Sequence, residues 1–129
     1  MVNNIKYLGE GKDHVIKIST SVPELFALST GKINSINLQA PSSIMRGEIV
    51  SINFNVVEKG ISNLKSVACI DVYDPDGKYI QYYSSNSDIT NGSGSYSFQT
   101  AMNDLPDTWK IRFTEVISSI EKEVSVLIK

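Results

Sequence analysis

Three tyrosines, Tyr79, Tyr82 and Tyr83, are the side chains whose types and spacing best fit a binding role in this chain. Aromatic faces stack on sugar rings, and the phenol hydroxyl adds a polar group that can hydrogen bond. Since successive side chains of a strand point to opposite faces, at most one of Tyr82 and Tyr83 joins a core. These three residues are therefore the candidates for a carbohydrate-binding surface, although core packing is the favoured interpretation of the rings.

Catalysis by a nucleophile would have to use His14, the single histidine of the chain. A Ser-His-Asp or Cys-His arrangement requires that imidazole, but the polar context of His14 favours a solvated surface side chain. One histidine and one cysteine, Cys69, also fall short of the three or four ligands that zinc requires. Cys69 lies mid-strand, where a small packed side chain is expected. We predict no catalytic residue, no metal site and no cofactor.

Acidic residues gather near the middle of the chain, at Asp71, Asp74, Asp76 and Asp88. Carboxylates of this kind can hold Ca²⁺, but no Glu closes the twelve-residue pattern of a calcium loop. Proline presets the backbone of a turn and glycine supplies its left-handed position, so turn geometry accounts for Asp74-Pro75-Asp76-Gly77. We therefore interpret Asp74 and Asp76 as turn residues, Asp71 as a residue beside that turn, and Asp88 as part of a polar loop.

Two further carboxylate pairs, Asp104 with Asp107 and Glu115 with Glu121, meet the minimal requirement of a glycosidase. Sequence spacing does not establish that two carboxylates flank one bond, and a small sandwich offers no deep cleft for a sugar ring. The preferred interpretation is turn residues and solvated strand ends.

Composition sets limits on the function classes. The chain has 129 residues, with 41% hydrophobic and 20% charged residues, as expected for one globular domain. With 12 Lys+Arg against 14 Asp+Glu and no basic cluster, it lacks the charge that nucleic-acid binding needs. No apolar run approaches the roughly 20 residues that span a bilayer. The single cysteine excludes an intrachain disulfide and leaves the compartment open, with an extracellular or periplasmic location favoured.

Alternating apolar residues dominate the chain and indicate β-strands. In the segment from Glu48 to Val57, apolar and polar side chains alternate with a period of two, typical of a strand with one buried face. Seven strands are predicted, at about 33–39, 48–57, 66–73, 78–84, 94–100, 108–114 and 121–128. Seven short strands separated by turn signals predict an all-β, immunoglobulin-like antiparallel β-sandwich.

The connections are predicted from turn chemistry. Asp74-Pro75-Asp76-Gly77 predicts a hairpin with Lys78–Tyr83 as its return strand. The segment from Ser84 to Ser95 is rich in Ser, Asn, Asp and Gly, so a long polar loop is expected there. Trp109 shares a strand face with Ile111 and Phe113, which favours a core anchor over an exposed sugar platform.

The first 32 residues differ from the rest. Ile5–Leu8, Val15–Ser19 and Leu25–Leu28 are predicted as three small strands, and a ribbon of this size is marginal alone. We therefore expect two parts. Residues 1–32 form an N-terminal extension of short strands, either added to an edge of the sandwich or ending a preceding β-sandwich, and residues 33–129 form the immunoglobulin-like sandwich.

Two stretches carry a resemblance to known modules. They are Pro41–Val50, with its Arg46-Gly47-Glu48 turn, and Asp71–Lys78 together with the segment from Ala101 to Ile111. They resemble the macroglobulin-type, immunoglobulin-like modules at the C-terminal end of large bacterial proteins. They are similar in particular to the β-sandwiches that follow the catalytic barrel of β-galactosidase-type glycoside hydrolases.

The resemblance implies a non-catalytic accessory module of a bacterial glycoside hydrolase, with a neighbouring domain of the same polypeptide as its partner. It carries over no catalytic residue, because in those proteins the catalytic residues lie in the barrel. The alternatives are a carbohydrate-binding module that uses Tyr79, Tyr82 and Tyr83, and a macroglobulin-like or adhesion domain that binds a protein.

Overall fold

The structure is a computed structural model that describes residues 6–29, 31–61 and 63–129. It is all-β. The strands are β1 (Lys32–Gln39), β2 (Ser43–Ile44), β3 (Ile49–Lys59), β4 (Lys65–Tyr73), β5 (Ser85–Thr90), β6 (Ser93–Gln99), β7 (Asp107–Glu115) and β8 (Glu121–Ile128). One short 3₁₀ helix, η1, spans Gln81–Tyr83. Among the described residues no helix is long and apolar enough to cross a membrane.

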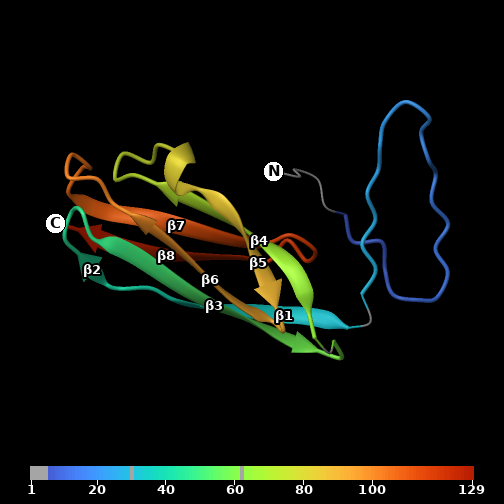
Figure 1. Cartoon of the computed structure of the whole chain (residues 1–129). Helices are drawn as coiled ribbons and strands as arrows, with labels where there is room; N and C mark the ends of the chain where they lie inside the picture. Colours follow the sequence, from blue (N-terminus) through green and yellow to red (C-terminus); the bar gives the residue numbers. More distant parts are fainter. Residues whose placement is uncertain (1–5, 30, 62) are drawn as a thin grey trace.

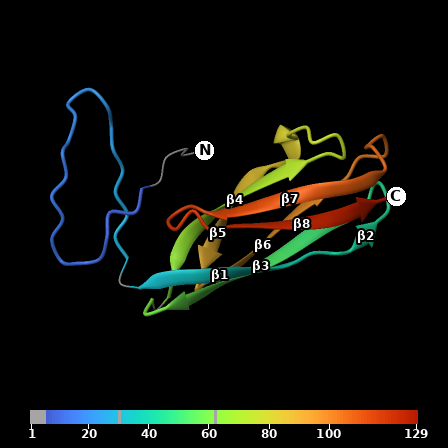
Figure 2. The same ribbon diagram turned by 180° about the vertical axis from the view of Figure 1, so that it is seen from behind.

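The strands form one curled sheet in the order β1-β3-β6-β5-β4-β7-β8-β2. All neighbours are antiparallel except β2, which runs parallel to β8 over two residues. β5 and β6 pair only at their hairpin end, where Thr90 faces Ser93. The sheet therefore folds into two layers, β1-β3-β6 and β5-β4-β7-β8-β2, as Figures 1 and 2 show from opposite sides. The predicted all-β, immunoglobulin-like sandwich is confirmed.

Alternating side chains from both layers fill the space between them. Phe54 of β3 meets Phe113 of β7 across the layers, with ring centroids 4.7 Å apart. Burying a side chain such as Phe113 stabilises the fold by about 1.5–3 kcal/mol. The most deeply buried apolar residues, beside these two, are Val50, Ile52, Ala68, Ile70, Val72, Ile89, Trp109, Ile111, Val126 and Ile128. The apolar residues whose alternation predicted β3 and β7 are therefore the residues that these strands contribute to the core.

The predicted return strand Lys78–Tyr83 is wrong. Tyr79 makes a single bridge to Tyr73, and the chain then turns through η1. Asp74 closes the turn, since its Oδ1 accepts the Lys78 N–H at 2.8 Å and its backbone carbonyl accepts the Gly77 N–H at 2.9 Å. After Tyr79, the Ile80 carbonyl accepts the Tyr83 N–H at 3.2 Å and the Ser84 N–H at 3.1 Å, which forms η1 and ends the pairing with β4. The Asp-Pro-Asp-Gly turn is thus real, but it leads into a helical turn rather than a strand.

The predicted polar loop from Ser84 to Ser95 is also wrong. It contains β5 and the start of β6, joined at Asn91-Gly92, where both residues have positive φ, 51° and 76°. An Asn-Gly pair is the strongest two-residue hairpin signal, since both positions tolerate the left-handed region. Only Ile89 of β5 is buried, so the strand has almost no apolar pattern by which to find it.

Residues 6–29 form no strand, which corrects the prediction of three small strands there. Ile5 of the first predicted strand lies outside the described residues. This segment is an extended loop beside the sandwich (Figure 1), and its apolar side chains are exposed, among them Val15, Ile18, Leu25 and Leu28. A strand needs a neighbour for its backbone groups, and the segment has none within the described part of the chain. The division at residues 1–32 and 33–129 stays a prediction.

Candidate functional site

The three tyrosines predicted to bind sugar fall into different environments. Tyr79 and Tyr82 are 47% and 73% exposed, whereas Tyr83 is only 6% exposed. Tyr79 meets Tyr73 edge-on at 5.8 Å, and Tyr82 meets Tyr83 edge-on at 4.6 Å. The helical turn η1 causes this separation, because it sends Tyr82 outward and Tyr83 into the core.

Tyr83 is a core residue, which corrects its assignment as a sugar contact. Its ring stacks on Phe98 at 4.7 Å and tilts against Trp109 at 5.8 Å. Its hydroxyl donates a hydrogen bond to Asp104 Oδ2 at 2.7 Å and accepts one from the Ala101 N–H at 2.9 Å. Burial, together with the Asp104 hydrogen bond, raises the pKa of Tyr83 to about 12. No free face remains for a ligand.

Trp109 is the core anchor that its alternation predicts. It is buried, and its indole N–H donates a hydrogen bond to the Leu105 carbonyl at 2.9 Å. A buried indole that satisfies its own donor has no polar atom left for a ligand. The interpretation of Trp109 as an exposed sugar platform is therefore excluded.

The carboxylates proposed as glycosidase pairs are engaged in turns. The buried Glu115 carboxylate accepts hydrogen bonds from the Ser66 hydroxyl, the Ile117 N–H at 3.0 Å and both the N–H and hydroxyl of Ser118 at 2.6 Å. Its partner in the proposed pair, Glu121, is exposed at the start of β8. Glu115 thus organises the β7–β8 turn.

The carboxylates of the other pair, Asp104 and Asp107, also accept hydrogen bonds from nearby residues. Asp104 accepts from Tyr83 and, at 2.8 Å, from the Ala101 N–H, while Asp107 is exposed and accepts the Thr108 N–H at 2.6 Å. Asp104 Oδ2 is therefore held in the connection before β7, and Asp107 Oδ1 bonds the next residue of β7. The interpretation of these acids as turn residues fits their contacts.

Cys69 sits in a setting that disfavours a thiolate. It is half-buried, and its Sγ donates to Asp71 Oδ1 at 3.8 Å. Burial, and next the negative charge of Asp71, raise the pKa of the Cys69 thiol. A nucleophilic cysteine needs the opposite, an electropositive environment that lowers the pKa. In the described residues, no three or more His, Cys, Asp and Glu side chains gather as a metal site would require.

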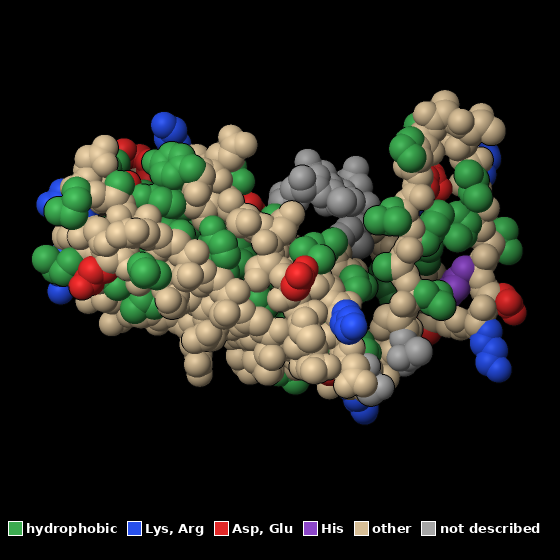
Figure 3. Space-filling model, viewed as in Figure 1, with side chains coloured by type: hydrophobic (Ala, Val, Ile, Leu, Met, Phe, Trp, Pro, Cys, Tyr) green, Lys and Arg blue, Asp and Glu red, His purple; other side chains and the backbone are tan. Residues whose placement is uncertain are grey.

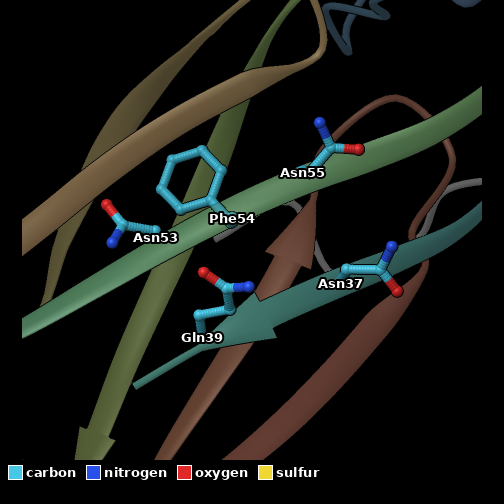
Figure 4. A pocket seen from close by; sticks show the side chains of 5 residues that line it. All are labelled: Asn37, Gln39, Asn53, Phe54 and Asn55. Atoms are coloured by element: carbon cyan, nitrogen blue, oxygen red, sulfur yellow. The ribbon is translucent and has the colours of Figure 1, made fainter. Parts of the chain in front are cut away.

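A shallow hollow lies instead on the outer side of β1 and β3, a place that the sequence interpretation did not select. It encloses about 200 Å³ and is lined by Asn37, Gln39, Asn53, Phe54 and Asn55. Figure 4 shows the four amide side chains coming from the two neighbouring strands. The sequence signal that could have identified this hollow is the type of the polar residues that alternate with the apolar ones. Along residues 33–39 and 49–57 they are Asn, Gln and Ser, without charged residues.

Comparison with known proteins gives a fold but no family. No protein-family model matches the chain, and no curated protein is significantly similar to it. Among solved structures, a beta-glucosidase from Listeria innocua superposes with a TM-score of 0.54 at 10% identity, covering 80% of this chain and 17% of that one. A mutant of a Listeria innocua beta-glucosidase in complex with laminaribiose gives a TM-score of 0.52 at 12% identity over 81% of this chain and 17% of that one.

A second kind of structure is also similar. The CARDB domain of the PF1109 protein from Pyrococcus furiosus, in complex with di-metal ions, gives a TM-score of 0.52 at 9% identity, covering 82% of this chain and 95% of that one. The chain is thus the size of that isolated domain and spans only 17% of the beta-glucosidases. At these identities the likeness is one of fold: a β-sandwich of the kind that occurs as one domain of larger proteins.

Proposed function

We propose that the chain is a non-catalytic accessory β-sandwich module of a larger bacterial protein, a glycoside hydrolase. The observation that carries the proposal is the fold similarity to a part of beta-glucosidases that covers 17% of their length but 80% of this chain. Such a module acts by spacing and packing, with a neighbouring domain of the same polypeptide as its partner.

Two features of the chain support this role. The buried acids Asp104 and Glu115 are committed to turns, so they are not free for acid–base catalysis. Residues 6–29 expose apolar side chains such as Val15, Leu25 and Leu28 that a neighbouring domain would cover. Large exposed apolar surfaces on a protein commonly mark sites where another domain or protein binds.

Two measurements test the proposal: the sequence of the complete reading frame, and the glycosidase activity of the purified chain. We expect the complete reading frame to encode a catalytic barrel beside this module, and we expect the purified 129 residues to leave a broad panel of chromogenic glycosides uncleaved. Hydrolysis that is lost in Glu115→Gln, with the fold kept, would contradict the proposal. So would a complete reading frame that contains only this module.

A second candidate, carbohydrate binding by aromatic stacking, is favoured by the exposure of Tyr79 and Tyr82. Stacking on an exposed tyrosine contributes about 0.5–1.5 kcal/mol, so binding to a soluble polysaccharide should weaken several-fold in Tyr82→Ala. Affinity electrophoresis measures this, with Tyr7→Ala as an exposed-tyrosine control. Equal retardation of wild type and Tyr82→Ala would exclude the aromatic site.

A further inference from the structure

The outer face of the β1-β3-β6 layer carries ordered rows of amide and hydroxyl side chains. One row crosses all three strands as Gln39, Asn53 and Ser95. The remaining rows, built by the same register, are Asn37 with Asn55 and Ser93, then Ser51 with Ser97. We call these eight residues the amide face. All of them are exposed, because the opposite side of each strand faces the core.

The amide face has no charge along its length. Residues 33–39, 49–57 and 93–99 contain no Asp, Glu, Lys, Arg or His, and the basic pair Lys32 and Lys59 lies at one end. Figure 3 shows a broad uncharged area over the middle of the sandwich, with charged side chains toward its ends. A protein with 20% charged residues would ordinarily place some of them on three exposed strands.

The outer face of the other layer is ordinary by comparison. Glu123 of β8 lies 3.7 Å from Arg112 and 4.0 Å from Lys110 of β7. The Arg112 guanidinium also lies 5.2 Å from the centre of the Tyr73 ring. The two layers therefore differ in the chemistry they present to solvent, and only the amide face is neutral.

The amides of this face are free to bind. No hydrogen bond within the described part of the chain engages the side chains of Asn37, Gln39, Asn53 or Asn55. Each amide donates two hydrogen bonds and accepts at its oxygen, so each can pair with a hydroxyl acting in either role. Directly opposed residues on neighbouring strands lie about 5 Å apart, which places two amides within reach of adjacent hydroxyls of one sugar ring.

We propose that the amide face binds a neutral polysaccharide, with one sugar residue in the hollow between β1 and β3 and the chain running across the face. The hollow of about 200 Å³ is too small and open to enclose a drug-sized ligand, which needs roughly 300 Å³ or more. A flat face with a shallow hollow instead fits a polymer bound over several residues. This binding does not depend on the accessory role.

The chemistry disfavours other occupants. Nucleic acids and acidic glycans need Lys or Arg to neutralise their charge, and the middle of this face has none. A stable protein interface needs an apolar core, whereas the exposed apolar residues here, Ile49 and Val57, lie toward opposite ends of β3. Uncharged hydroxyls are the groups that match what the face offers.

The test is affinity electrophoresis of the whole chain in gels that contain a β-1,4-glucan, a β-1,3-glucan, a xylan, a mannan or polygalacturonate. We expect at least one neutral polysaccharide to retard the protein, and 0.5 M NaCl to leave that retardation unchanged. The double variant Asn37→Thr/Asn55→Thr should weaken binding about tenfold or more, since each lost hydrogen bond is worth roughly a factor of five. Threonine favours strands, so this variant keeps β1 and β3.

The matched control is Asn86→Thr on β5, an exposed asparagine outside the amide face, and it should bind as the wild type does. Tyr82→Ala distinguishes the amide face from the aromatic site. Retardation by none of the neutral polysaccharides, retardation by polygalacturonate alone, or wild-type binding by the double variant would each overturn the proposal. Loss of binding in Tyr82→Ala with wild-type binding by the double variant would assign the site to the tyrosines instead.

Discussion

Residues 6–29 and strand β3 carry similar apolar residues and end in opposite environments. Val50 of β3 is fully buried, whereas Val15 in the extended segment is fully exposed. β3 has a neighbour on each side, β1 and β6, while the segment has none within the described part of the chain. The difference shows that an apolar, strand-like sequence becomes a strand only where a second strand satisfies its backbone and a second layer covers its side chains.

The largest expected effect lies in the core. Phe113→Ala removes the ring that meets Phe54 across the layers and should lower the free energy of unfolding by about 3–5 kcal/mol. Leu25→Ala, in the exposed segment, should change it by less than about 0.5 kcal/mol. Urea denaturation of the two variants measures both values. Similar losses would mean that residues 6–29 are packed in solution.

Glu115→Gln should have the next largest effect, roughly 2–3 kcal/mol. The carboxylate accepts hydrogen bonds from Ile117 and from Ser118, and glutamine would turn an NH₂ group toward those donors. Glu121→Gln, at the exposed start of β8, is the matched control and should be nearly neutral. Thermal unfolding compares the two. A Glu115→Gln protein as stable as the wild type would refute the structural role of this carboxylate.

Tyr83→Phe should cost about 1–2 kcal/mol at neutral pH, because it leaves the buried Asp104 without its hydroxyl donor. The effect should depend on pH. Since the folded pKa of Tyr83 is about 12 against an ordinary value of 10.0, the unfolded chain loses this proton first as pH rises. Stability should therefore fall between pH 10 and 12, and less steeply in Tyr83→Phe. An unchanged slope in Tyr83→Phe would contradict the buried position.

The smallest effect is expected from the extended segment itself. Deletion of residues 6–29 removes apolar side chains that are exposed, so the unfolding free energy should change by less than about 0.5 kcal/mol. Calorimetry of the full chain and the deletion variant measures this. A loss of 2 kcal/mol or more would show that these residues belong to the fold of the sandwich.

Sequence reasoning worked where side chains alternate strongly. The strand predicted at 48–57 is β3, and those at 108–114 and 121–128 are β7 and β8. It failed at β5, whose single buried residue, Ile89, leaves no period to detect. It failed again after Gly77, because whether a chain continues as a strand or turns depends on hydrogen bonds of Asp74 and Ile80 that form only in the fold.

The candidate sites were likewise found from the sequence only in part. The aromatic residues were found by type, and alternation predicted that at most one of Tyr82 and Tyr83 joins the core. Only the fold, with η1 at this point, decided that the buried one is Tyr83. The amide face was missed because asparagine and serine at alternate positions are the expected solvent side of a strand. Only the register of β1, β3 and β6 places them in rows.

By itself the sequence determined the all-β class, the central core strands and the core role of Trp109. These follow from composition and from the period of two, which are local. The tertiary structure alone decided which tyrosines are exposed, which acids close turns and which polar residues share a face. Those properties depend on contacts between residues far apart in the chain, and local spacing carries no information about them.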